Sequence, residues 1–335
     1  MMRMRDKPAW FNVVNETPDG EVVLELAQSA VNAAAIATRQ GWRNAYDALI
    51  AAAHEFCVMP TEERCAKRML ELLGFYRQTR PKEKVSPEEL CERMNELCRS
   101  GAVAVAQLSP GKDGSFVAVR LDDYTGEGEN PDPSRRYYCC GEWAPYPHQF
   151  VKDVWIRWPD GKDHNSSPRP RKNSGGKKTE FEVPKDHRTF RYCQMNPEGR
   201  RIGDCTVRAM SLACGVTWHE ALDLLADGTD YANARVNTTE TLEVAIKRAG
   251  FVRCGVLRKD GRLLKGADFC MAMNRRYHNG ERILVYLGRS HIAAVLPEKN
   301  GEYKILDSWD STQKYAGAYF VKRSDDRDRD KVQSA

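Results

Sequence analysis

The sequence has no long hydrophobic run: no stretch approaches the roughly 18 apolar residues of a membrane span, so we expect no membrane-spanning segment and no membrane partner. The basic start, Met1 to Trp10, leads into no apolar stretch and predicts no signal peptide. The 11 cysteines are odd in number and irregularly spaced, which favours reduced thiols over a disulfide framework. Together these absences predict a cytoplasmic protein.

Paired metal-ligand motifs are also scarce. Cys139-Cys140, and His54 with Cys57, each lack a second pair at ligand spacing, so we expect neither a metal nor a cofactor. The net charge of +5 is small and comes largely from local basic runs, so it does not by itself indicate a nucleic-acid-binding protein. A content of 41% hydrophobic and 30% charged residues is typical of a soluble globular protein.

The length of 335 residues suits two domains of about 100–200 residues each. Between them, residues 159–187 are rich in Gly, Ser, Pro and basic residues, which predicts a flexible linker. A basic linker can also grip a phosphate backbone weakly, but the aromatic platforms used for single-strand binding are missing, which favours a simple tether. We therefore predict domains over 15–158 and 188–323, and a disordered tail over 324–335.

Each domain is expected to be α+β, with helices before strands. In the first half, helical periodicity and start signals predict helices over 21–53, 61–73 and 87–98. Alternating apolar residues then predict strands over 102–108, 116–121, 136–140 and 150–158. The same order follows the linker, with helices expected from 205, over 217–225 and over 238–248, and strands over 282–287, 291–296, 303–306 and 319–322.

The two halves match one another at a constant shift of 176 positions. Trp42 falls on Trp218 and Gly74-Phe75 on Gly250-Phe251, and the match continues at Ala118-Val119. After a longer loop in the first half, Trp143 corresponds to Trp309, and 150–152 to 320–322. Chance agreement between amphipathic helices is the alternative. The agreement across helices, a hairpin and a last strand favours two copies of one fold.

Three polar residues of the second copy stand at the ends of elements. Cys205 begins a helix, where the unpaired N–H groups favour the thiolate. His291 begins a strand and Asp307 ends the next, so two antiparallel neighbours would bring them side by side. We predict a catalytic triad of Cys205 as nucleophile, His291 as general base and then acid, and Asp307 as the group that orients the imidazole.

Further residues are expected to support this triad. An oxyanion would be bound by the Cys205 backbone N–H and by a side-chain amide from the preceding loop, Gln194 or Asn196. Asp204 is predicted as a helix cap, with Arg208 one turn later as its partner. Trp309 either shields the bond between Asp307 and His291 from water or belongs to the core.

The first copy lacks all three triad residues. At the same correspondence Cys205 falls on Ser29, His291 on Ser115 and Asp307 on Gly141. The first copy is therefore predicted to be a degenerate pseudoenzyme, kept for packing, substrate recognition or regulation.

The order of Cys at a helix start, then His, then Asp on the following strand resembles papain-like cysteine peptidases, most closely the bacterial bacteriocin-leader-processing group. The resemblance covers roughly 188–322 and implies two papain-like units, each with a helical part packed on a twisted antiparallel sheet. It also implies cleavage of a peptide or isopeptide bond through a thioester. Those peptidases carry an oxyanion glutamine about six residues before the cysteine, where this sequence has Gly199. The segment 203–209 is also similar, over a shorter length, to the nucleophile segment of ovarian-tumour-type deubiquitinases.

The sequence thus predicts a cysteine-dependent peptidase or isopeptidase that acts on a peptide or protein, and a bacterial or phage accessory protein would suit such a tandem. An inert tandem module that holds a peptide without cutting it is the alternative. Attachment to nucleic acid through the basic linker is a third possibility.

Overall fold

The computed structural model of the chain describes residues 11–13, 26–78, 83–97, 101–109, 115–121, 137–141, 145, 149–164, 182–201, 203–232 and 239–323. The chain divides into two compact units, one of Met1–Phe56 with Pro60–Ser174 and one of Cys57–Met59 with Gly175–Ala335. This division falls within the predicted linker, of which 165–181 lie outside the described residues, as does the predicted tail. No helix in the described part is both long and apolar enough to cross a membrane.

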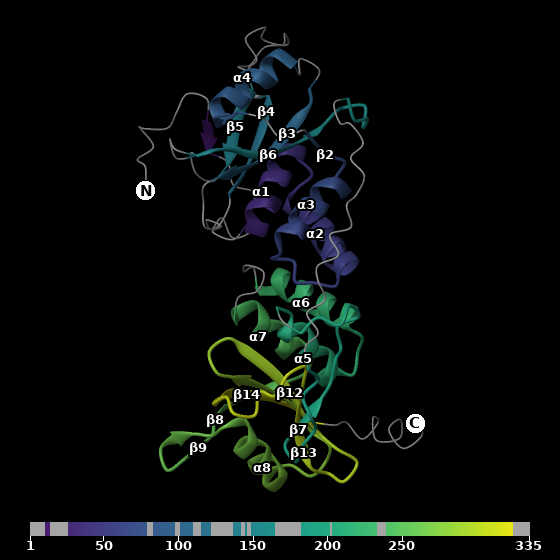
Figure 1. Cartoon of the computed structure of the whole chain (residues 1–335), viewed down its shortest axis with the longest axis vertical. Coiled ribbons are helices and arrows are strands. Elements are labelled where there is room, and N and C mark those ends of the chain that lie inside the picture. The colour runs from purple at the N-terminus through teal and green to yellow at the C-terminus, as the bar shows by residue number, and fades with distance from the viewer. Residues whose placement is uncertain are drawn as a thin grey trace. The chain divides into compact units, whose positions relative to one another are not determined.

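In the first unit, three helices follow a short first strand, and a fourth helix comes before the main strands (Figure 1). They are α1 (Leu26–Thr38), α2 (Trp42–Phe56), α3 (Glu63–Leu72) and α4 (Pro87–Leu97). The single helical stretch expected over 21–53 is divided in two, because Arg39 and Gly41 have φ of 55° and 81° and a left-handed residue ends a helix. The other two predicted helices are confirmed within a few residues at each end.

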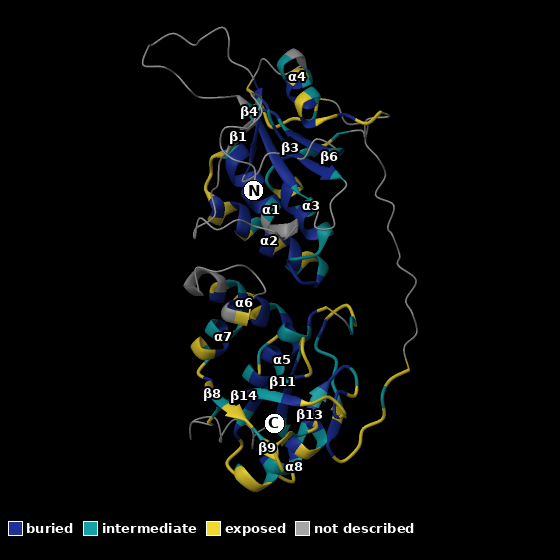
Figure 2. Ribbon diagram, turned by 90° about the vertical axis from the view of Figure 1, so that its left-hand side faces the viewer, coloured by how far each residue is buried: buried dark blue, intermediate teal, exposed yellow. Residues whose placement is uncertain are grey.

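A six-stranded sheet forms the rest of the first unit. Its strands are β1 (Phe11–Val13), β2 (Tyr76–Arg77), β3 (Val103–Ser109), β4 (Phe116–Leu121), β5 (Tyr137–Gly141) and β6 (Phe150–Arg157). The order is β1-β5-β4-β3-β6-β2, antiparallel except for the parallel pair β1 and β5. The five inner residues of β3 are all buried, since α1 contacts β3 and β4 while residues of α4 share a core cluster with alternate residues of β3 (Figure 2).

The second unit repeats this arrangement. Its helices are α5 (Cys205–Cys214), α6 (Trp218–Ala232), α7 (Thr239–Arg248) and α8 (Gly266–Arg276). Its main sheet contains β7 (Phe190–Tyr192), β8 (Val252–Val256), β11 (Arg282–Leu287), β12 (His291–Pro297), β13 (Tyr303–Asp307) and β14 (Ala316–Lys322), and β9 (Arg258–Lys259) pairs with β10 (Arg262–Leu263) in a separate hairpin. Helix α8 and the strands β7 to β10 were not predicted from the sequence, and α6 extends seven residues beyond its predicted end.

The two units are α+β and share one topology. The second sheet has the order β7-β13-β12-β11-β14-β8, which matches the first strand for strand, with the parallel pair again at one edge. Helices α2 and α6 have identical bounds after the shift of 176 positions, as do α3 and α7. The predicted duplication is therefore present in the fold.

The pairing register corrects the last part of the sequence match. Ala104 pairs with Val119 and Ile156, and Ile283 pairs with Val295 and Val321. Since Val119 corresponds to Val295, Ile156 corresponds to Val321. The match of 150–152 with 320–322 is therefore wrong by five residues. A shift of the strand by five residues, an odd number, would turn every side chain of the strand to the other face of the sheet. The observed strand pairing therefore excludes the match predicted from the sequence.

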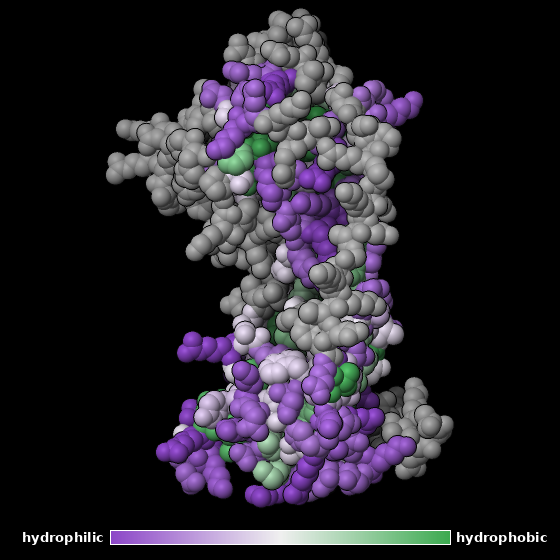
Figure 3. All heavy atoms as spheres, viewed as in Figure 1, coloured by the Kyte–Doolittle hydropathy of each residue, from purple (hydrophilic) through white to green (hydrophobic). Residues whose placement is uncertain are grey.

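Large hydrophobic side chains are exposed at five positions of the described chain: Leu72, Val183, Val252, Val256 and Tyr315. Figure 3 shows the described surface of the second unit on one face as mostly hydrophilic, with only small hydrophobic patches. An apolar surface alone therefore does not locate a binding site on that face.

The contact between α6 and α7 depends on a glycine. A Cβ at Gly228 would lie 2.8 Å from the Ala245 Cβ and 2.9 Å from the Thr241 carbonyl oxygen. We expect Gly228→Ala to destabilise the second unit, because overpacking costs about 1–3 kcal/mol and the gain in helix propensity is at most about 1 kcal/mol. The urea midpoint should fall, whereas Gly255→Ala, which meets no atom within 4 Å, should leave it nearly unchanged. An equal midpoint for the two variants would contradict this.

Candidate active site

The predicted triad lies where a helix start meets the ends of two strands. Cys205 is the first residue of α5, His291 the first of β12 and Asp307 the last of β13. Helix α5 contacts β12 and β13, and these two strands are antiparallel neighbours with Ala294 paired to Leu306 (Figure 1). The fold therefore brings together three residues that are far apart in the chain.

A short hydrogen bond joins His291 to Asp307, with Nε2 at 2.6 Å from Oδ2. The other ring nitrogen, Nδ1, is not used by Asp307 and is left for Cys205, which also acts on the pKa of the imidazole. Burial of the ring acts to lower the pKa of His291, but the hydrogen bonds and negative charges of Asp307 and Cys205 outweigh burial and raise the pKa to about 9. The imidazolium is therefore the stable form at neutral pH.

The pKa of Cys205 is shifted in the direction that favours the thiolate. Burial is the largest single influence on its pKa and acts to raise it. The hydrogen bond and charge of His291, followed by the N–H of Ile292 and the charge of Arg208, bring the pKa below the ordinary value. Burial raises the pKa of Cys193 and Cys214, so Cys205 differs from these other partly buried thiols. A thiolate–imidazolium pair is the reactive form of a cysteine nucleophile.

Asp307 is buried, and several donors hydrogen-bond to its carboxylate. Its Oδ1 accepts the Ser308 backbone N–H at 2.7 Å and Nη1 of Arg208 at 3.4 Å, and its Oδ2 accepts the Ser311 hydroxyl at 2.9 Å. Arg208 also donates to the Ser308 hydroxyl. The contacts of Asp307 with Ser308, Ser311 and Arg208 were not predicted from the sequence.

Asp204 is tied to the same network and does not cap the helix. Its side chain makes no capping hydrogen bond to α5, so that prediction is wrong. Its Oδ1 accepts Nε of Arg208 at 2.8 Å, as the predicted pairing requires, and its Oδ2 accepts the Trp218 Nε1–H at 2.9 Å. Arg208 thus lies buried between two buried carboxylates, Asp204 and Asp307.

The two predicted oxyanion amides are used elsewhere. Asn196 is buried, and its Nδ2 donates to Asp204 Oδ2 at 2.7 Å and to the Cys57 carbonyl oxygen at 2.9 Å, which accounts for both amide hydrogens. Gln194 Nε2 donates to the Arg200 carbonyl oxygen at 2.8 Å. Both amides therefore order the loop before Cys205, and the structure does not assign either of them to an oxyanion.

The start of α5 supplies other donors. Its first intrahelical bond runs from the Arg208 N–H to the Asp204 carbonyl oxygen at 3.1 Å. The N–H groups of Cys205, Thr206 and Val207 come before that bond and have no acceptor within the helix. They are the donors nearest in sequence to the thiolate.

Trp309 packs on the imidazole, with ring centroids 4.9 Å apart and planes tilted by 51°. Lys314 Nζ lies 5.8 Å from the centroid of the same indole. Trp309 is half-buried and covers the imidazole of His291 from one side. Of the two roles predicted for Trp309, this position favours shielding over a place in the core.

The first unit keeps the framework of this site without its reactive groups. The Ser29 hydroxyl accepts the Phe116 backbone N–H at 2.8 Å, and the N–H of Ile292, the residue that corresponds to Phe116, helps to lower the pKa of Cys205. The sheet register places Gly141 at the position of Asp307. The first unit therefore has no carboxylate at the position from which Asp307 hydrogen-bonds to the imidazole in the second unit.

No protein family model, no curated protein and no solved structure matches the chain. The resemblance to papain-like peptidases therefore stays a prediction. Within the described residues, no disulfide joins the ten cysteines, and no group of three or more His, Cys, Asp or Glu side chains is placed to hold a metal ion.

The lowered pKa of Cys205 predicts a particular pH profile of alkylation. The rate with iodoacetamide should rise through a midpoint below the ordinary pKa of 9.0 and then level off, because only the thiolate reacts. The ion pair exists between this lowered pKa and the His291 pKa of about 9. In His291→Ala the midpoint should move up, since the opposite charge and hydrogen bond are lost. Peptide mass spectrometry measures the rates.

Cys214, at the other end of α5, is the internal control for this measurement. Burial raises its pKa, so its alkylation should be slow at neutral pH and unaffected by His291→Ala. Identical profiles of Cys205 in the wild type and in His291→Ala would show that the imidazole does not ionise the thiol.

The buried position of Arg208 predicts a large effect of its removal on stability. Arg208→Met leaves Asp204 and Asp307 without their shared cation, and breaking a buried pair in this way costs about 3–5 kcal/mol. Arg43→Met is the control, because Arg43 and Asp47 form a pair with side chains 54% and 58% exposed, worth at most about 1 kcal/mol. Urea unfolding compares the two variants, and a loss below about 1 kcal/mol for Arg208→Met would refute the role of Arg208 as shared cation.

Proposed function

We propose that the chain is a cysteine-dependent peptidase or isopeptidase, built from two papain-like units of which the second carries the catalytic triad. The observation that supports this most is the charge state of the triad. Cys205 has a lowered pKa in a buried setting, and His291 has a raised pKa and a 2.6 Å bond to Asp307. pKa values shifted in opposite directions in neighbouring groups are typical of catalytic sites.

In the proposed reaction, the Cys205 sulfur attacks the carbonyl carbon of the scissile bond. The carbonyl oxygen becomes an oxyanion, which the free N–H groups at the start of α5 can stabilise. Collapse of the intermediate breaks the C–N bond, and the imidazolium of His291 transfers its Nδ1 proton to the leaving amine. The products of this step are a free amine and a thioester on Cys205.

Hydrolysis completes the cycle. Neutral His291 takes a proton from a water molecule, whose oxygen attacks the thioester carbon, and the second tetrahedral intermediate expels the thiolate and a carboxylic acid. Asp307 keeps the imidazole oriented throughout and compensates its charge. If an amine replaces the water, the same steps give acyl transfer.

An inert peptide-binding module would require none of this charge arrangement. In the first unit, Ser29, Ser115 and Gly141 replace the triad, yet its sheet has the same strand order. The fold therefore forms without a cysteine, histidine and aspartate at these positions. Their presence in the second unit is better explained by chemistry than by folding.

A peptide with a vinyl sulfone in place of its scissile bond tests the proposal. We expect one adduct per chain by intact mass, complete loss of the adduct in Cys205→Ala, and labelling at least about 100-fold slower in His291→Ala, in line with the usual effect of a lost general acid and base. Cys214→Ala, on the same helix but with a raised pKa, should label like the wild type. Slow labelling spread over many cysteines would favour the inert module.

A further inference from the structure

Two cationic residues lie beside the proposed triad, at the end of the second sheet where β12 begins. Leu287 pairs with His291 on one side and with Ala316 on the other, so these three residues form one row across β12, β11 and β14. Arg289 belongs to the turn that joins β11 to β12, and Lys314 lies two residues before Ala316. Both cationic residues are therefore at the same end of the sheet as His291.

Lys314 has a fixed place next to the triad. Its backbone N–H donates to the Ser311 carbonyl oxygen at 3.0 Å, and its carbonyl oxygen accepts the Gly266 N–H at 2.9 Å. Its Nζ lies 5.8 Å from the centroid of the Trp309 indole, which packs on the imidazole of His291. The same indole therefore lies next to both the imidazole and the ammonium group.

No carboxylate in the described part of the chain compensates these two charges. Arg289 and Lys314 are exposed, and neither charged group forms an ion pair or a hydrogen bond there. Asp310 is the acidic residue nearest to Lys314 in the sequence, and its carboxylate bonds to the His187 ring at 3.0 Å and to the Thr312 N–H at 3.0 Å. The indole attracts the ammonium group but does not neutralise it. Two positive charges are thus available beside the triad.

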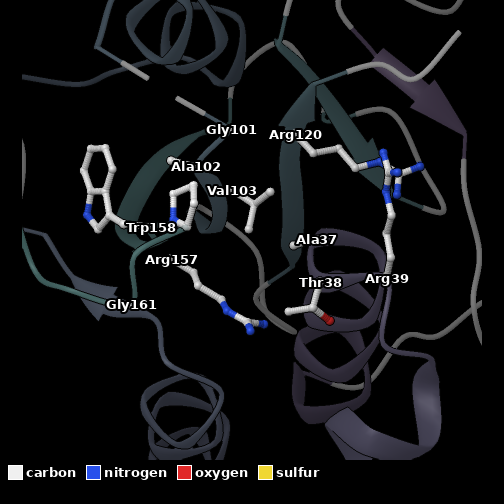
Figure 4. A pocket seen from close by; sticks show the side chains of 11 residues that line it. Ala37, Thr38, Arg39, Gly101, Ala102, Val103, Arg120, Arg157, Trp158 and Gly161 are labelled. Atoms are coloured by element: carbon white, nitrogen blue, oxygen red, sulfur yellow. The ribbon is translucent and has the colours of Figure 1, made fainter. Parts of the chain in front are cut away.

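The first unit also gathers positive charge, but without such a focus. Arg39, Arg120 and Arg157 line a cavity of about 440 Å³ at the end of α1 (Figure 4). In Figure 4 the Arg157 guanidinium points away from those of Arg39 and Arg120, and Arg120 donates to the Ile36 carbonyl oxygen at 2.9 Å. No cysteine, histidine or acidic residue belongs to the described lining. The charges that adjoin reactive groups are therefore those of the second unit.

The proposed reaction determines which half of a substrate meets Arg289 and Lys314. The leaving amine has to approach Nδ1 of His291, because the imidazolium transfers its proton to that amine. The acyl half stays on the Cys205 sulfur. The chain that follows the scissile bond therefore passes the imidazole and the indole next to it. An extended peptide advances about 3.3 Å per residue, so one of the first three residues after the bond can reach the two cations.

We infer, on the basis of the proposed function, that the substrate carries a carboxylate within three residues after the scissile bond, and that Lys314 and Arg289 bind it. A guanidinium binds a carboxylate through paired N–H donors, and an ammonium group adds a compact positive charge. An Asp or Glu side chain, or the C-terminus of a short leaving peptide, supplies this carboxylate. Lys314 and Arg289 are then residues that determine specificity and take no part in the chemical steps.

Incubation of the full chain with two synthetic libraries of random octapeptides tests the inference, with the cut positions read by mass spectrometry. Both libraries are N-acetylated, and one is amidated at the C-terminus. In the amidated library we expect Asp and Glu to be enriched at least about threefold after the cut, as an exposed ion pair allows. The enrichment should fall at high salt. Cleavage only near a free C-terminus would instead identify the terminal carboxylate as the ligand.

Three variants separate recognition from folding. Lys314→Glu should turn the preference toward Lys and Arg after the cut, a reversal that partial unfolding cannot produce. Arg289→Gln should reduce the enrichment of carboxylates. Lys299→Gln is the matched control and should leave the preference unchanged, because Lys299 is an exposed lysine in the turn at the other end of β12.

The outcomes distinguish this inference from the proposed function. Cleavage without a preference for carboxylates, or the same preference in Lys314→Glu as in the wild type, would overturn the inference and leave the peptidase proposal in place. An absence of cleavage in both libraries would also overturn the inference. Labelling of Cys205 by the vinyl sulfone peptide then shows whether the peptidase proposal fails with it.

Discussion

The positive charge of Arg208 is the constraint on which the second unit's site depends. Its buried guanidinium lies between two buried carboxylates, Asp204 and Asp307, each of which would cost several kcal/mol without a partner. His291 and Cys205 continue the series, so five groups alternate in charge from Asp204 to the thiolate. The Cys205 thiolate is thus the last of five groups whose charges compensate one another. This compensation allows a cysteine that is removed from water to ionise.

Each of these five charged groups depends on its neighbours for compensation, which explains why the first unit lacks all of them. A glycine in place of Asp307 would leave the imidazole without its acceptor and Arg208 with a single carboxylate. In the first unit the position of Arg208 is Asn32, which is neutral, and the triad positions are Ser29, Ser115 and Gly141. Neutral groups at all of these positions remove the need for compensation. The shared strand order and apolar core are then sufficient to keep the fold.

Features encoded by neighbouring residues could be predicted from the sequence. The Glu89 N–H donates to the Ser86 hydroxyl at the start of α4, and Thr217 and Glu220 form the expected capping box before α6. The triad was also predictable, because a reactive residue at the end of an element lies where elements meet. The bond between Arg208 and Asp307 could not be predicted, because the two residues are 99 positions apart and the sequence around each gives no indication of the other as its partner.

Helix α8 was missed, and the last strands of the two halves were matched wrongly, for a different reason, which concerns the duplication itself. Helix α4 has the same length as α8, but the two are related by a shift of 179 positions, whereas α2 and α6 are related by 176. The three additional residues come before α8, in the region where the second unit has the β9–β10 hairpin. Beyond β12 the shift falls again, to 165 for Ile156 and Val321. Loops change length freely while strand pairing does not, because a slip in register would move buried side chains to the wrong face. Two copies of a fold therefore keep their strand register longer than their loop lengths. A comparison that allows a new shift at each loop would have placed α8 and matched the last strands correctly.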